Sequence, residues 1–420
     1  MRVMAAAILI AGALAGGAAM AAQEPVAAWV QMGGDGAQAR AISDGASCPV
    51  LKVDGRARRM TPRAGPDDAF ANRICQAPLP RGARRASVGG AALPMPRQRP
   101  RRLVILGDSG CRLKGAIVQN CNDPVAGWPF ARVAVLAAAQ HPDLVIHVGD
   151  YYYRETACPE GNAACAGSPY GDRWPSWKAE LFDPAASLLK AAPWVFARGN
   201  HEDCRRGGLG WFRLLDADTG VRACPAHSDS FLVDLGGLKL GVVDSADPDD
   251  ATLAPDQAEA FDKDLAPVRA AAARGPVWLV THRPLWETGR NGATLSDLHG
   301  NINEQSAVRA HGLGEVQLVV AGHIHNFTSL DFGPGRPPQL IVGTAGDAQN
   351  AADLPPPAIG PLKVDGMTAQ AFTMGRFGYF VFDRVGVSKN ADWVGVFRDL
   401  TDTVVANCVL KAGRLSCVAA

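Results

Sequence analysis

Short apolar runs that end in polar residues recur through the middle of the chain. The clearest is Leu144–Tyr153, in which Val and Ile precede a glycine, an aspartate and three tyrosines. Such a run is typical of a buried strand. Its end would bring Asp150 to the edge of a sheet, where α/β proteins bind ligands. Because one carboxylate can bridge two cations, Asp150 is a candidate for the centre of a dinuclear metal site.

Four further runs end in the same way, and each supplies side chains with oxygen or nitrogen donors. Two histidines at the end of the last run alternate along an extended segment, so they lie on one face. Five such runs together favour a metal site over packing alone. The four are Arg102–Gly110 with Asp108, Trp194–Glu202 with Asn200 and His201, Val277–His282 with His282, and Val316–His325 with His323 and His325.

The order Gly-Asp, Gly-Asp-x-x-Tyr, Gly-Asn-His-Glu, His and Gly-His-x-His resembles the calcineurin-like metallophosphoesterase superfamily over residues 102–346. Within it, the chain is most similar to purple acid phosphatases. The commoner opening is Asp-x-His, but this chain has Asp108-Ser-Gly110, and the tyrosine of purple acid phosphatases is present at Tyr153. The resemblance implies an α/β fold in which two mixed β-sheets are sandwiched between helices.

The resemblance also implies two overlapping sets of metal ligands. These donor types suit iron, manganese and zinc, so we expect two metal ions, iron plus iron, zinc or manganese. A hydroxide held by the metals would attack phosphorus, and His201 would protonate the leaving group or bind phosphate. The implied sets are Asp108, Asp150, Tyr153 and His325 for one ion, and Asp150, Asn200, His282 and His323 for the other.

The leading expectation is an acid phosphatase that hydrolyses phosphate monoesters. A phosphodiesterase or a nucleotidase could use the same metals, because loops rather than ligands select the leaving group. A phosphate- or metal-binding module without turnover is the non-enzymatic alternative. The extra substrate-contacting histidines of the family have no counterpart in Glu287–Gly292. Candidate substitutes, beside His201, are His299, Arg290 and His227.

The first 21 residues are typical of a secretory signal, with Arg2, an apolar core from Met4 to Ala15, and Ala19-Met-Ala21 as a cleavage site. An uncleaved membrane anchor is the alternative interpretation. No other stretch of the sequence is apolar enough to span a bilayer. We therefore expect a secreted or periplasmic chain with no membrane attachment after cleavage of the signal.

The chain has 10 cysteines. An even number in an exported chain favours disulfides, and the absence of Cys-x-x-Cys weakens a structural-zinc interpretation. The sequence does not fix the connectivity, and pairing between neighbours along the chain is a preference. The stretch Glu155–Trp177, which contains two cysteines, is expected to cover the pocket.

Residues 22–98 lack helical periodicity and contain β-like pieces such as Ala27–Gln31 and Pro49–Val53. We expect a small β domain with a basic, Pro-rich linker, followed by a phosphoesterase domain over residues 99–420. There, strands alternate with helical stretches. Lys and Arg total 42 against 41 for Asp and Glu, so no charge excess indicates nucleic acid. The expected partner is a small phosphorylated substrate, and the oligomeric state stays open.

Overall fold

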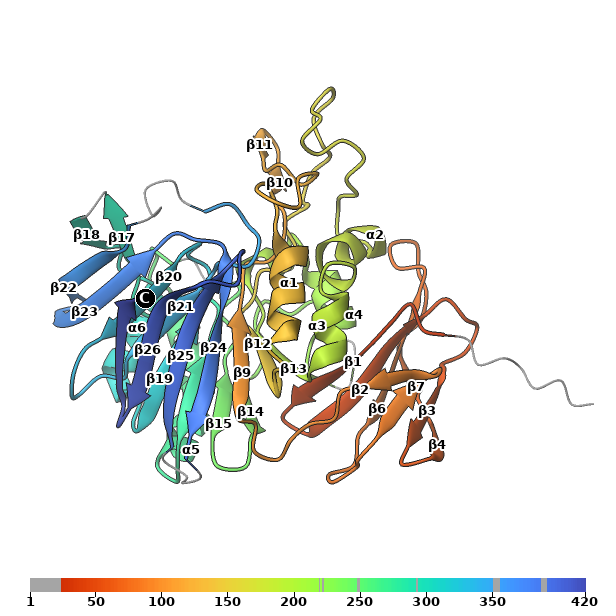
Figure 1. Cartoon of the computed structure of the whole chain (residues 1–420), viewed down its shortest axis with the longest axis horizontal. Coiled ribbons are helices and arrows are strands. Elements are labelled where there is room, and N and C mark those ends of the chain that lie inside the picture. The colour runs from red at the N-terminus through yellow and green to blue at the C-terminus, as the bar shows by residue number, and fades with distance from the viewer. Residues whose placement is uncertain are drawn as a thin grey trace, which may run out of the picture.

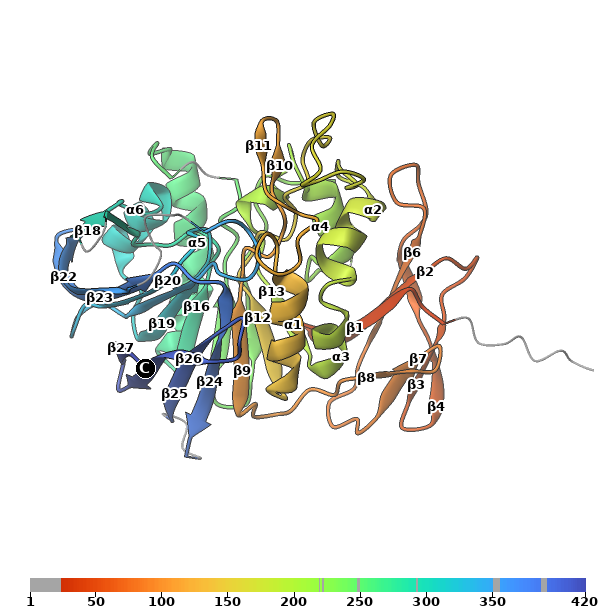
Figure 2. The same ribbon diagram turned by 45° about the horizontal axis from the view of Figure 1, so that its top comes forward.

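In the computed structural model, two large mixed β-sheets pack face to face with helices on both outer sides (Figure 1, Figure 2). This arrangement confirms the predicted α/β sandwich. Among the residues that the structure describes, no helix combines the length and apolar character needed to cross a bilayer. The predicted signal peptide, residues 1–21, lies outside those ranges. The structure describes residues 24–218, 220, 223–247, 250–291, 294–349, 356–386 and 391–420.

The larger sheet takes its strands from both ends and from the middle of the chain. Its central strands β9, β12 and β13 are parallel, so their carboxyl ends meet at one edge of the sheet. In spatial order the eleven strands are β27 (Arg414–Ala419), β26 (Val404–Lys411), β25 (Asp392–Asp399), β24 (Gly378–Val385), β9 (Arg102–Leu106), β12 (Leu144–His147), β13 (Trp194–Phe196), β1 (Ala27–Gly33), β2 (Gly36–Ser43), β6 (Arg73–Pro78) and β5 (Thr61–Ala64).

The smaller sheet also has a parallel centre, formed by β15, β16, β19 and β21. Apolar side chains of the two sheets, such as Ile146 and Trp278, interdigitate to form the core between them. In spatial order the eight strands are β14 (Phe231–Asp234), β15 (Lys239–Val242), β16 (Val277–Val280), β19 (Val316–Ala321), β21 (Gln339–Val342), β20 (Phe327–Asp331), β23 (Met367–Met374) and β22 (Ala358–Val364).

The helices pack on the outer faces of the two sheets. Strand residues alternate between these faces and the central core, so Ile105 packs between the sheets and Val104 packs toward helices α1, α3 and α4. Helices α5 and α6 cover the smaller sheet. The helices and helical turns are α1 (Phe130–Ala139), α2 (Trp174–Trp177), η1 (Lys178–Phe182), α3 (Ala186–Ala191), η2 (Asn200–Glu202), α4 (Gly208–Leu214), α5 (Pro255–Ala272) and α6 (Ile302–His311).

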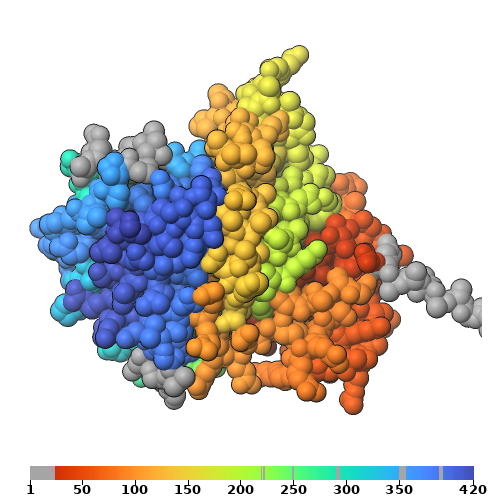
Figure 3. All heavy atoms as spheres, in the orientation of Figure 1, coloured from red at the N-terminus to blue at the C-terminus, as the bar shows by residue number. Residues whose placement is uncertain are grey.

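The N-terminal segment has the predicted β character, and part of it extends the larger sheet. Strand β1 pairs in parallel with β13, with Gln31 beside Trp194. Figure 3 shows the N-terminal segment, in red and orange, packed against the middle of the chain. Strands from residues 22–98 and from residues 99–420 belong to one sheet. The division into two domains at residues 98 and 99 therefore stays a prediction. The separate small sheet consists of β4 (Arg56–Arg59), β3 (Val50–Val53), β7 (Ala86–Val88) and β8 (Ala91–Leu93).

Two buried arginines bind the N-terminal strands to the end of helix α4. Arg40 donates hydrogen bonds to the Leu214 and Asp216 carbonyls at 2.9 and 2.6 Å. Arg63 donates to the Phe212 carbonyl at 2.7 Å. The last carbonyls of a helix have no partner within the helix itself, so these guanidinium groups complete the hydrogen bonding at the end of α4.

All cysteines pair with their neighbours along the chain, as preferred from the sequence. Two of the bonds hold the hairpin β10 (Leu113–Lys114)–β11 (Ile117–Val118) and the loop 155–172, which project together at the top of Figure 1. A second short hairpin consists of β17 (Thr288–Asn291) and β18 (Thr294–Asp297). The disulfides are Cys48–Cys75, Cys111–Cys121, Cys158–Cys165, Cys204–Cys224 and Cys408–Cys417.

Candidate metal centre

The predicted ligands follow parallel strands whose carboxyl ends meet where the edges of the two sheets face each other. The folding pattern that produces this convergence is the parallel centre of each sheet, because parallel strands present all their carboxyl ends at one edge. Asp108 follows β9, Asp150 and Tyr153 follow β12, Asn200 and His201 lie in η2 after β13, His282 follows β16, and His323 and His325 follow β19.

The first predicted ligand set converges on the hydroxyl of Tyr153. This oxygen lies 2.7 Å from Asp150 Oδ2, 3.1 Å from His325 Nε2 and 3.3 Å from Asp108 Oδ1. Tyr153 and Asp108 are fully buried. The structure therefore brings together the four side chains that the sequence predicts for one ion.

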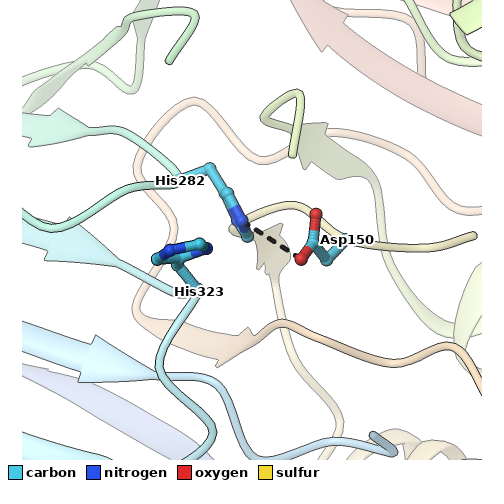
Figure 4. A group of neighbouring side chains, drawn as sticks. All are labelled: Asp150, His282 and His323. Atoms are coloured by element: carbon cyan, nitrogen blue, oxygen red, sulfur yellow. Dashed lines mark ion pairs between the residues drawn. The ribbon is translucent and has the colours of Figure 1, made fainter. Parts of the chain in front are cut away.

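The second predicted set converges on the side-chain oxygen of Asn200. His282 Nε2 lies 2.9 Å from it and His323 Nδ1 lies 2.8 Å from it. Figure 4 shows His282 pointing at Asp150, with His282 Nε2 at 3.2 Å from Asp150 Oδ2. Asp150 contacts members of both sets, which is the position required of a bridging carboxylate.

The three histidines each use one ring nitrogen for an outward contact and turn the other toward the converging oxygens. A metal-binding imidazole characteristically has this arrangement, because the outward hydrogen bond fixes the tautomer and the ring orientation. The donor set therefore fits two cations. The outward contacts are His282 Nδ1 with the Val148 carbonyl at 2.8 Å, His325 Nδ1 with the Ala348 carbonyl at 2.9 Å, and His323 Nε2 with Asp250 Oδ2 at 3.1 Å.

The electrostatics of the site also demand positive charge. Burial alone would raise the pKa of Asp150, but His282 and His201 hold it well below its ordinary value. Burial would likewise lower the pKa of His282, yet Asp150 raises it to about 9. Burial acts in the same way on His325, where Asp347 and Asp108 raise the pKa to about 9. Buried carboxylates thus hold protons on these imidazoles, and cations would take the place of those protons.

Gly110 explains how Tyr153 reaches the site. A Cβ atom at Gly110 would lie 2.5 Å from Tyr153 Cδ2 and would also overlap the Glu180 carboxylate. The tyrosine ring therefore packs where the commoner Asp-x-His pattern has a side chain. Burial, together with the charges of Asp150 and Asp108, raises the pKa of the Tyr153 phenol well above its ordinary value. The phenol would ionise only beside a strongly charged ion.

One buried carboxylate fixes the two loops that carry Asp150 and Asn200. Glu202 Oε1 accepts hydrogen bonds from the Tyr151 and Tyr152 amides at 2.8 and 2.9 Å. Its Oε2 accepts from the Asp150 and Gly199 amides, both at 3.0 Å. The end of β12 and the turn after β13 are therefore held together by a side chain of the Gly-Asn-His-Glu motif.

Three proposed ligands have left-handed backbone conformations, which are uncommon for residues other than glycine. Their φ angles are 56° at Asp108, 59° at Asp150 and 70° at His323. Such conformations are destabilising and concentrate at functional sites, where the surrounding structure enforces them. Their occurrence at three turns after strands supports a functional role for these turns.

His201 lies against the first ligand set. Its ring centroid is 3.8 Å from that of Tyr153, and its amide donates to Asp150 Oδ1 at 2.9 Å. Its Nδ1 lies 2.7 Å from Glu155 Oε1. Sequence reasoning missed this carboxylate, which immediately follows the Gly-Asp-Tyr-Tyr-Tyr-Arg run. A carboxylate on Nδ1 orients an imidazole and leaves Nε2 free for proton transfer.

The structure describes the side chains of two candidate substrate residues, His299 and His227. The His299 side chain is 85% exposed, at 3.7 Å from Asp297, and His227 forms an ion pair with Asp264 of α5. Neither contacts a proposed ligand within the described residues. The side chain of Arg290 lies outside the described part of the chain. The substrate roles of these three residues stay predictions.

Two further carboxylates at the site were not predicted. Asp250 follows β15 and contacts His323, and Asp347 follows β21, with Oδ2 at 3.5 Å from His325 Nε2. Both come after parallel strands, as the predicted ligands do. The pair Gly346-Asp347 repeats the Gly-Asp pattern that precedes Asp108 and Asp150, and this repeat is the signal that could have identified it.

The comparison with protein families gives a match over the part of the chain that carries this site. The family model for calcineurin-like phosphoesterases matches residues 102–327, which contain every predicted metal ligand. The chain belongs to the calcineurin-like phosphoesterase family. Members of this family hydrolyse phosphate esters, so the chain is a metallophosphoesterase with a candidate metal centre at the edge between its sheets. Among curated proteins, none matches the sequence.

Two solved structures share the fold of this phosphoesterase. Purple acid phosphatase PPD1 from seeds of yellow lupin (Lupinus luteus) has a TM-score of 0.57 at 14% identity, over 94% of this chain and 74% of that chain. The structure of PhoD has a TM-score of 0.55 at 11% identity, over 95% of this chain and 91% of that chain. At these identities the likeness concerns the fold alone.

Proposed function

We propose that the chain is an exported phosphatase of purple acid phosphatase type, which binds two metal ions and hydrolyses phosphate monoesters. The observation that carries this proposal is the position of Asp150, whose carboxylate contacts members of both predicted ligand sets. Five disulfides support export, because such bonds persist in oxidising compartments.

The two predicted ligand sets differ in the metal ions that they favour. The phenol and carboxylates around His325 suit iron, and the amide and imidazoles around Asn200 suit iron, zinc or manganese. When bound, two such ions act as Lewis acids that activate water and stabilise the transferring phosphoryl group. The proposed holders are Asp108, Asp150, Tyr153 and His325 for the first ion, and Asp150, Asn200, His282 and His323 for the second.

His201 is the proposed acid that protonates the leaving alkoxide. Glu155 lies on its Nδ1 and fixes the ring, and Tyr153 packs against its face. Burial would raise the pKa of Glu155, but the contact with His201 lowers it below the ordinary value. The carboxylate therefore stays ionised near neutral pH and orients the imidazole, so that Nε2 is the ring nitrogen left to deliver a proton.

Hydrolysis of p-nitrophenyl phosphate and of its diester analogue, with metals measured on the same sample, tests this function. We expect two metal ions per chain and faster turnover of the monoester. Asp150→Asn should lose metal at both positions and reduce kcat by at least about 100-fold, because a neutral oxygen replaces the shared anion. Asp392→Asn, on strand β25, is the matched control.

Two results would contradict the proposal. Metal-loaded wild-type protein that hydrolyses neither ester would indicate a binding module. Faster turnover of the diester would instead indicate a phosphodiesterase that uses the same residues.

A further inference from the structure

We propose that Arg112, oriented by Asp347, binds the phosphoryl group of the substrate and makes this site selective for phosphate monoester dianions. The inference rests on the proposed function and names the residue that selects its substrate class. Arg112 lies outside the family's motifs quoted above, four residues after Asp108. It would supply a substrate contact in place of the family's histidines, which have no counterpart in Glu287–Gly292.

Arg112 lies directly beside Tyr153 of the first predicted ligand set. Its guanidinium carbon is 4.9 Å from the centroid of the Tyr153 ring, on the ring face. Its amide donates to Gln119 Oε1 at 3.0 Å, and the Cys111–Cys121 disulfide closes the loop that carries it. These contacts fix the backbone from which the guanidinium extends, so its position at the site is preorganised.

Asp347 holds one edge of this guanidinium and leaves the other free. Arg112 Nε lies 3.0 Å from Asp347 Oδ2, and Nη2 donates to the same oxygen. Asp347 is itself fully buried, and its amide donates to the Asp108 carbonyl at 2.8 Å. Nη1 has no hydrogen-bond partner among the described residues, and the Arg112 side chain is 25% exposed. A phosphoryl oxygen could therefore reach it.

Two other arginines near the site lack such a free edge toward solvent. Arg206 directs Nε and Nη2 at Asp203, and its Nη1 lies 3.7 Å from Glu155. Arg283 donates to the Ser245 carbonyl and to Asp250, and its side chain is 10% exposed. Among these three arginines, Arg112 combines exposure with unused donors.

The chemistry of the substrate makes this contact selective. A phosphate monoester dianion has three non-bridging oxygens and two negative charges, whereas a diester has two such oxygens and one charge. A guanidinium beside two cations therefore has an additional anionic oxygen to bind in the monoester, and charge-assisted hydrogen bonds of this kind are strong. Arg112 would contribute little to binding of a diester.

Arg112→Met tests the inference in the metal-loaded full chain. We expect the dissociation constant of inorganic phosphate, measured by calorimetry, to rise by about 10- to 100-fold. The kcat/KM for p-nitrophenyl phosphate should fall by a similar factor, and that for the bis(p-nitrophenyl) diester by less than about 3-fold. Arg102→Met is the control, because Arg102 also pairs with one aspartate, Asp383, through Nε and Nη2, but lies at the start of β9, away from the end that leads to the site.

The alternatives give different results. Unchanged phosphate binding, or equal losses on both esters, would overturn the inference. Loss of metal from Arg112→Met would also overturn it, because Arg112 would then act only by holding Asp347. If this variant does not fold, Arg112→Lys keeps the charge and should show a smaller loss in the same direction. Wild-type protein that binds two metals but neither phosphate nor ester would overturn the proposed function as well.

Discussion

Tyr153 lies at the centre of the first predicted ligand set, and Gly110 provides the room for its ring. Burial and two neighbouring carboxylates disfavour its ionisation, so a phenolate at this position requires a strongly charged ion. Ferric iron meets this requirement better than zinc or manganese(II). A phenolate bound to ferric iron absorbs visible light by charge transfer, which makes the role of a single residue measurable.

Iron-loaded protein should therefore be coloured, and Tyr153→Phe should remove the visible band. Absorbance at equal iron content is the measurement, with far-UV circular dichroism to check the fold. Tyr151→Phe is the matched control, because Tyr151 is equally buried but donates its hydroxyl to the Ala197 carbonyl at 2.8 Å. A wild-type protein that binds iron without a visible band, or a band that survives in Tyr153→Phe, would exclude the phenolate ligand.

At the scale of the elements, the site depends on how closely the ends of β12 and β13 approach each other. Gly199 lies at the turn after β13, and a Cβ atom there would overlap the backbone nitrogen and the carboxylate of Asp150. Its φ of −93° is open to any residue. The requirement for glycine at this position is therefore one of space and not of backbone conformation.

Gly199→Ala should displace Asp150 and weaken metal binding at both positions. Overpacking of this kind costs about 1–3 kcal/mol of unfolding free energy. Elemental analysis after dialysis against a chelator, together with denaturant unfolding, measures both effects. Gly275→Ala is the control, because a Cβ atom there meets no atom within 4 Å. Full metal content in Gly199→Ala would show that the turn can move without weakening metal binding.

The sequence predicted those parts of the site that local patterns encode. Asp150, Asn200 and His323 each follow an apolar run, and such a run predicts both a strand and the place where it ends. Asp347 also follows such a run and carries the Gly-Asp signal, but its contacts with His325 and Arg112 were not predictable, because they depend on β21 lying beside β19. Which strands become neighbours is decided by tertiary packing and leaves no local pattern.

At the scale of the whole molecule, the N-terminal strands show most clearly that strand neighbours could not be predicted from local patterns. Their β character was predictable, but the pairing of β1 with β13 was not. Trp29 of β1 is fully buried, and its ring centroid lies 5.3 Å from that of Phe182. Arg40 and Arg63 bind carbonyls at the end of α4. The N-terminal strands therefore complete the larger sheet and its outer face.

A chain that begins at Arg99 should accordingly fail to form a stable, soluble monomer. Removal of β1 would leave β13 as an exposed edge and would uncover apolar side chains beneath Trp29, which favours aggregation. Size-exclusion chromatography and thermal unfolding would show this, with a chain that begins at Glu24 as the control. A monomeric fragment with cooperative unfolding would instead establish residues 99–420 as an independent domain.

The pairing of each cysteine with its neighbour has a consequence for biogenesis. The linked cysteines are 7 to 27 residues apart, so both partners of a bond emerge from a ribosome or an export channel almost together. Oxidation can therefore follow the order of synthesis, without reshuffling of wrong partners. The larger sheet has the opposite property, because β9 pairs with β24, which is made much later. Covalent closure is thus an early and local event, whereas completion of the sheet waits for the end of translation.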